Sequence, residues 1–139
     1  MIFSNIIINE NQVFKCSGSG IYNSVSSPLY QNILFSDNNC TESGGGMFNY
    51  QSSPSLQNIV FKNNKAKDGG GITNQDNSAP TILNSLFVNN TATTDGGAIY
   101  NVANSSPTLV NITVVGNNNT DGGLFNEDTS NPSLYNSII

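Results

Sequence analysis

Apolar and polar positions alternate along this chain in short runs, and the whole pattern returns about every 26 residues. A proline marks each period, and an asparagine follows it four positions later. The prolines are Pro28, Pro54, Pro80, Pro107 and Pro132. A unit this short cannot bury an apolar face alone, so its copies must stack on one another. The pattern therefore predicts a solenoid over the whole chain.

Each repeat holds three short runs of β type: one led by glycines, one after the proline and one containing phenylalanine or valine. Glycine pairs and a proline in every unit would destabilise a helical repeat, because Gly costs about 1 and Pro about 3 kcal/mol relative to Ala. The chain is therefore expected to form a parallel β-helix of about five coils of 25–27 residues. The predicted inward columns are Met47, Ile72 and Ile99; Leu56, Ile82, Leu109 and Leu134; and Phe35, Phe61, Phe87 and Val114.

The asparagine after each proline-led run is interpreted as a structural ladder. Stacked at one corner of the coil, its side-chain amide can bond the turn and the next asparagine, at about 1 kcal/mol net per bond. The ladder residues are Asn32, Asn58, Asn84, Asn111 and Asn136.

Two further columns are predicted to face outward. On the glycine-led run, an aromatic stripe would provide rings against which a glycan or protein docks, or would simply stabilise the sheet by cross-strand pairing. Its members are Tyr22, Phe48, Thr73, Tyr100 and Phe125. A second, apolar column on the phenylalanine run is expected to comprise Leu34, Val60, Leu86 and Ile138.

Charge excludes some partners. With nine acidic residues against four lysines, and a net charge of -5, the chain would repel nucleic acid. No apolar run approaches the roughly 20 residues of a membrane-spanning helix, so no membrane insertion by this segment is expected. Nothing in the sequence indicates a cofactor.

One acidic residue per coil precedes the glycine-led run, namely Asp68, Asp95 and Asp121. Neighbours in this column would lie roughly 5 Å apart. That spacing suits a Ca²⁺ site or a catalytic carboxylate pair, so these three are weak metal candidates. The alternative is that each carboxylate accepts a hydrogen bond from its own Gly-Gly turn.

Cys16 and Cys40 occupy equivalent turns of adjacent coils, 24 residues apart. This places them within reach of a disulfide, with two separate buried thiols as the alternative.

Gly-Gly-Ala-Ile at 96–99 and Phe-x-x-Asn at 35–38, 61–64 and 87–90 resemble the repeat pair of chlamydial-type polymorphic outer-membrane proteins, within the pectin-lyase-like right-handed β-helix class. The resemblance covers nearly the whole chain and implies a right-handed helix, export, cell-surface display and adhesion. The chain shows no transporter barrel and no signal, so a secreted or bacterial surface location is an expectation from the resemblance.

Residues 1–139 are thus expected to form one solenoid domain, a segment of a longer repeat protein, that binds a glycan or protein on a cell surface without catalysis. One alternative is a polysaccharide lyase or glycoside hydrolase, although the chain has no Arg and no His for such chemistry. Another is a structural spacer, since no polar cap closes either end and open strand edges favour end-to-end or side-by-side self-association.

Overall fold

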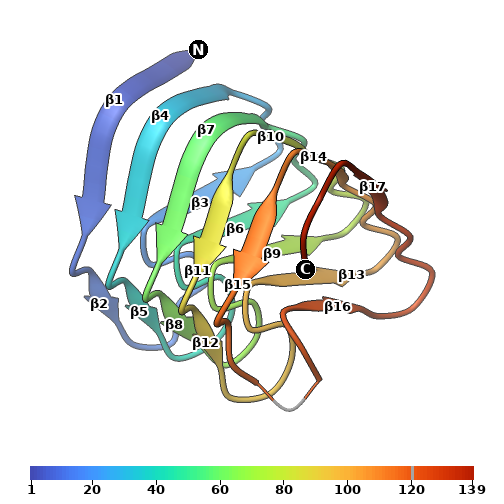
Figure 1. The fold of residues 1–139 in the computed structure, drawn as a ribbon. Coiled ribbons are helices and arrows are strands. Elements are labelled where there is room, and N and C mark those ends of the chain that lie inside the picture. The colour runs from blue at the N-terminus through green and yellow to red at the C-terminus, as the bar shows by residue number, and fades with distance from the viewer. Residues whose placement is uncertain (120) are drawn as a thin grey trace.

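The computed structural model describes residues 1–119 and 121–139, and the strands of this part of the chain pair in parallel in three sheets (Figure 1). The long sheet contains β1 (Ile2–Asn9), β4 (Leu29–Ser36), β7 (Ser55–Lys62), β10 (Thr81–Leu83), β11 (Leu86–Val88), β14 (Thr108–Val110), β15 (Thr113–Val115) and β17 (Ser133–Tyr135). The glycine-led sheet contains β3 (Ile21–Ser24), β6 (Met47–Tyr50), β9 (Ile72–Gln75), β13 (Ile99–Val102) and β16 (Leu124–Asn126). The short sheet contains β2 (Gln12–Val13), β5 (Asn39–Cys40), β8 (Lys65–Ala66) and β12 (Thr91–Ala92).

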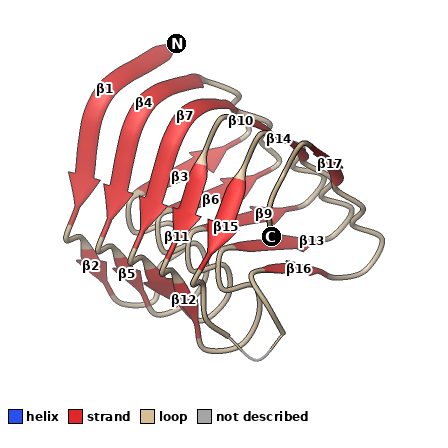
Figure 2. Cartoon of the chain, in the orientation of Figure 1, coloured by secondary structure: helices blue, strands red, loops and turns tan. Residues whose placement is uncertain are grey.

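The coils rise as a right-handed superhelix, the usual hand of connections between parallel strands (Figure 1). Figure 2 shows strands and loops only, and no helix in the described residues is long and apolar enough to cross a membrane. The first four coils pass through the long sheet, the short sheet and the glycine-led sheet in turn. The next coil continues from β15 to β16, with an isolated bridge between Thr91 and Asn118 beside the short sheet. The predicted right-handed parallel β-helix is confirmed.

The three faces differ from the expected strands in two respects. In the first coils the proline-led and phenylalanine runs merge into single eight-residue strands, β4 and β7, and only later coils separate them. The third face is the short sheet, built from two-residue strands that the sequence suggested were polar turns. A pair such as Lys65-Ala66 is too short to show an alternating pattern, so periodicity alone misses it.

The predicted inward columns form the core. Met47, Leu56, Ile72, Ile82, Ile99 and Leu109 are fully buried. Phe35, Phe61 and Phe87 are also fully buried and stack with ring centroids 4.8 Å apart, the spacing of neighbouring strands. Leu134 is the exception at 41% exposed, because the described chain places no further coil over it.

The predicted asparagine ladder is present on the surface. Asn58 donates to Asn32 at 3.1 Å, Asn32 donates to Asn5 at 3.1 Å, and Asn111 donates to Asn84 at 3.0 Å. All the predicted members have φ between 48° and 55°, in the left-handed region that asparagine tolerates better than most residues. The residue thus bends the long sheet as well as bonding its neighbour.

A second, buried asparagine ladder was not predicted as such, although Phe-x-x-Asn marks its position. Asn38, Asn64 and Asn90 are fully buried. The backbone N–H and the side-chain Nδ2 of Asn38 both donate to Oδ1 of Asn64, at 3.1 and 2.9 Å. Asn64 repeats this arrangement toward Asn90, and its Nδ2 also donates to the Phe35 carbonyl. Each rung therefore joins three successive coils.

The glycine-led sheet carries its own ladder, in which each Nδ2 donates to the next Oδ1 at 2.8 Å. Its members are Asn23, Asn49, Asn74, Asn101 and Asn126. A serine ladder runs beside it, with each backbone N–H donating to Oγ one coil later. Its members are Ser26, Ser52, Ser78, Ser105 and Ser130.

Cys16 and Cys40 form a disulfide with their α-carbons 5.8 Å apart, as the sequence suggested. The bridge joins the first two coils beside the short sheet.

We expect Asn64→Ala to lower the free energy of unfolding by about 3 kcal/mol, because it leaves buried donors of Asn38 without an acceptor. Asn58→Gly is the matched control: it removes an exposed rung and keeps the positive φ, so it should cost about 1 kcal/mol or less. Urea unfolding of both variants measures the difference. If both variants lose the same free energy of unfolding, burial does not determine how much an asparagine rung contributes to stability.

Replacing both Cys16 and Cys40 by Ala should cost about 3 kcal/mol, the entropy of closing a loop of this length. The urea midpoint of the native chain should fall on adding a thiol reductant, whereas the midpoint of the double variant should not move. A reductant-insensitive native chain would contradict the bridge.

Candidate binding surface

The outward column of the glycine-led sheet has the predicted register. Tyr22 pairs with Phe48, Phe48 with Thr73, Thr73 with Tyr100, and Tyr100 with Phe125. Tyr22 and Phe48 stack with ring centroids 5.4 Å apart, and Tyr100 and Phe125 do so at 6.0 Å. Strand pairing thus holds each ring in a fixed row on a rigid face.

The column is not the continuous exposed stripe that the sequence predicted. Phe48 is only 4% exposed and Thr73 only 1%, whereas Tyr22 is 51% exposed. Phe48 therefore cannot present its ring to a partner, and the expectation that it binds is wrong. The stripe is divided into two aromatic pairs, with a buried threonine between them.

The turn before each glycine-led strand folds back close over that strand. At Gly44 an added Cβ would lie 2.9 Å from Cβ of Phe48 and 2.4 Å from the Met47 carbonyl oxygen. At Gly69 an added Cβ would meet Oγ1 of Thr73, which donates to the Asp68 carbonyl at 3.0 Å. Both glycines have positive φ, so only glycine allows the turn to lie this close.

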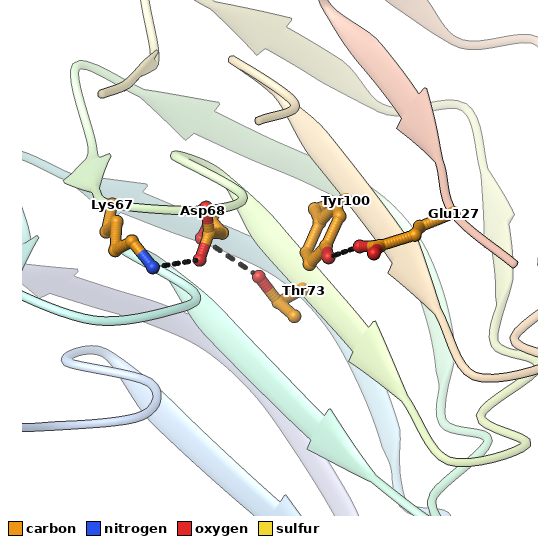
Figure 3. A network of polar contacts seen from close by, with 5 residues as sticks. All are labelled: Lys67, Asp68, Thr73, Tyr100 and Glu127. Carbon is orange, nitrogen blue, oxygen red and sulfur yellow. Dashed lines mark hydrogen bonds and ion pairs between the residues drawn. The ribbon is translucent and has the colours of Figure 1, made fainter. Parts of the chain in front are cut away.

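Tyr100 and Phe125 remain half-buried and accessible at the other end of the column. The Tyr100 hydroxyl donates to Glu127, the residue two positions beyond Phe125 on the next coil (Figure 3). Burial, followed by this contact with Glu127, raises the pKa of Tyr100, so the hydroxyl stays protonated. The sequence reasoning missed Glu127, although its spacing of 27 residues from Tyr100 is one period.

The acidic column borders the same face. Burial is the main cause that raises the pKa of Asp68 and of Asp95, and the neighbouring Asp121 adds to the shift of Asp95. Lys67 Nζ lies 3.7 Å from the Asp68 carboxylate and opposes the shift there (Figure 3). The surface around Tyr100 is therefore acidic and contains one compensated lysine.

The acidic column is the weak metal candidate of the sequence. In residues 1–119 and 121–139, no group of three His, Cys, Asp or Glu side chains is placed to hold a metal ion. The turns are instead bonded between coils, since the N–H groups of Gly44 and Gly69 donate to the carbonyl oxygens of Asp68 and Asp95, each at 2.9 Å. These backbone bonds give the turns that carry Asp68 and Asp95 a structural role.

The second outward column is also in register, with Leu34 opposite Val60, Val60 opposite Leu86, and Thr113 between Leu86 and Ile138. Leu34, Val60 and Leu86 are half-buried. Thr113 interrupts the apolar row before Ile138.

Tyr50 is a further outward aromatic residue that the sequence reasoning did not single out. It lies on β6 two positions after Phe48, and its hydrogen bond with Asp76 is the main cause that raises its pKa. The same pairing of a tyrosine with an acidic residue of the next coil thus occurs twice on this sheet.

Comparison with known proteins gives one match. Residues 58–75 and 84–102 match the model of the Chlamydia polymorphic membrane protein repeat. Each matched segment begins at an asparagine of the exposed ladder and ends on a glycine-led strand, so the resemblance seen in the sequence is confirmed over two successive coils. The match indicates a surface or outer-membrane protein. The chain matches no curated protein and no solved structure.

Because the pKa of Asp95 is raised in the folded chain, protonation stabilises the fold. That stability is complete below the unfolded pKa of about 3.9 and is lost as the pH rises through the higher folded pKa. We expect Asp95→Asn to raise the melting temperature at pH 7, with the difference from the native chain shrinking toward pH 4.

Asp128→Asn, at an exposed loop position, is the control and should change the melting temperature little. The native melting curve should be the same with and without Ca²⁺. A Ca²⁺-dependent stabilisation that Asp95→Asn removes would instead show that the acidic column binds the ion.

Proposed function

We propose that this chain is a binding module of an exported, surface-displayed protein, which holds a glycan or protein partner without converting it chemically. The observation that carries the proposal is the stacked pair Tyr100 and Phe125 on the outer face of the glycine-led sheet. Half-buried aromatic rings fixed on a rigid sheet offer apolar contact area at little cost in conformational entropy.

The neighbouring groups suit recognition. Glu127 fixes the Tyr100 ring through its hydroxyl, while the carboxylates of Asp68 and Asp95, whose charges act on Tyr100, supply hydrogen-bond acceptors near the pair. Sugars commonly present an apolar ring face edged by hydroxyl donors, and basic peptides present cations that aromatic faces and carboxylates both attract. Both chemistries fit an acidic aromatic patch.

Two further findings support surface display. The repeat match relates two coils to surface proteins, and the disulfide between Cys16 and Cys40 is typical of chains that fold in an oxidising compartment. Many polar backbone and side-chain groups form hydrogen bonds within the ladders. These bonds make the coil a rigid support for side chains on its surface.

A catalytic role is the less favoured alternative. Glycoside hydrolysis needs two carboxyl groups at a set separation across the scissile bond, one of them held as an acid. The raised pKa of Asp95 beside Asp121 has the electrostatic character of such a pair. The chain has no His or Arg to complete other β-helix chemistries, so we favour binding.

We first select the polysaccharide or cell surface that retains most of the native chain. On that surface, the retained amount of the double variant Tyr100→Ala and Phe125→Ala should be at least roughly tenfold lower, since two ring contacts are lost. Phe14→Ala is the matched control, because it removes an aromatic ring that is 85% exposed outside the glycine-led sheet. Retention is measured by pull-down at several protein concentrations. Circular dichroism melts confirm that both variants are folded.

Undiminished retention by the double variant would contradict this binding surface. Equal loss in Phe14→Ala would show that exposed aromatic rings bind without regard to position.

A further inference from the structure

The outer face of the short sheet is hollowed in the middle of the stack, where β5, β8 and β12 lie side by side (Figure 1). The cavity has a volume of about 290 Å³ and is lined by residues of the second, third and fourth coils. Described coils flank these three on both sides. The cavity is therefore a feature of the side of the solenoid.

Alternation along the short strands gives this face the shape of a groove. Cys40, Ala66 and Ala92 point inward and are at most 4% exposed. The residues directly before and after them point outward in two rows along the solenoid axis, separated by roughly 7 Å, which is twice the rise of a strand residue. Members of both rows line the cavity, which therefore lies between them. The rows are Asn39, Lys65 and Thr91, and Thr41, Lys67 and Thr93.

The groove carries positive charge on an acidic chain. Lys65 and Lys67 face each other across it on one coil, and within the part of the chain that the structure describes no acidic residue lines the cavity. Lys67 Nζ lies 3.7 Å from the carboxylate of Asp68, whereas Lys65 has no ion-pair partner among the described residues. Lys65 is therefore the cation that most needs an external anion.

Uncharged hydrogen-bonding groups accompany these lysines. The Asn39 amide and the Thr93 hydroxyl line the cavity, as does Thr41, whose Oγ1 accepts from the Lys15 N–H at 2.7 Å. Lys15 thus continues the row of Thr41 one coil earlier, two coils or roughly 10 Å from Lys67. The groove offers cations at intervals, with amide and hydroxyl groups between them.

We propose that this groove binds an acidic polysaccharide whose carboxylates alternate with uncharged sugars. Lys65 and Lys67 hold one carboxylate by charge-assisted hydrogen bonds, and the amide and hydroxyl groups bind sugar hydroxyls. Duplex DNA carries one charge per about 1.7 Å, far denser than the cations here, so the spacing favours the sugar polymer.

This site is separate from the aromatic pair Tyr100 and Phe125. That pair lies on the glycine-led sheet among carboxylates, which repel an anionic sugar. The two faces therefore select ligands of different charge, and the groove does not depend on the function proposed for the pair.

Calorimetric titration with a short hyaluronate oligosaccharide tests the groove. Lys65→Gln should raise the Kd roughly tenfold, because a charge-assisted hydrogen bond is lost. Thr93→Tyr should weaken binding at least as much, since it fills the groove without changing the charge. Lys62→Gln is the matched control: it removes the same charge from an exposed lysine outside the cavity, so it should change the Kd less than roughly twofold.

The double variant Tyr100→Ala and Phe125→Ala should bind this oligosaccharide as the native chain does, which separates the two sites. Circular dichroism melts identify any variant that fails to fold. The proposal is overturned if the native chain does not bind the oligosaccharide, or if a neutral chitin oligosaccharide or a DNA strand of equal length binds as tightly. Equal losses in Lys62→Gln and Lys65→Gln also overturn it, because net charge alone would then explain binding.

Discussion

The fold depends on one constraint: every coil must place its polar corner residues directly above those of the coil before it. The buried amides of Asn38, Asn64 and Asn90 meet this constraint, since each accepts from one neighbouring coil and donates to the next. A buried amide without its partner would cost more than the bond contributes, so a shift of register by one residue is strongly disfavoured. The stacked phenylalanine rings fill the space between these corners.

How much of this the sequence predicts depends on whether a feature repeats. The period, the inward columns and the exposed ladder recur in successive coils, so they are visible without coordinates. The sequence does not reveal the short sheet, because a strand of two residues is too short to show alternation. The sequence does contain the buried asparagine ladder as the motif Phe-x-x-Asn, but not the role of that asparagine. Burial of Phe48 and Thr73 depends on contacts with other parts of the coil, which alternation along that strand does not report.

The outward side chains of the coils differ from one repeat to the next, whereas the inward ones are similar. The outward row of the glycine-led sheet contains Tyr, Phe, Thr, Tyr and Phe in turn, although the inward row beside it is uniformly aliphatic. The outward residues of this row are not rungs of the asparagine ladder, so the row varies while the ladder stays the same. The pairing of Tyr100 with Glu127 shows that one coil can fix a side chain of its neighbour, so the proposed binding surface spans two coils.

The central claim is that this surface binds and does not catalyse. The most direct test incubates the native chain with acidic and neutral polysaccharides and with intact cells, and measures retained protein and released oligosaccharide in the same samples. Our account predicts retention on at least one surface with no released product. Release of oligosaccharide, or no retention on any of these surfaces, would contradict it.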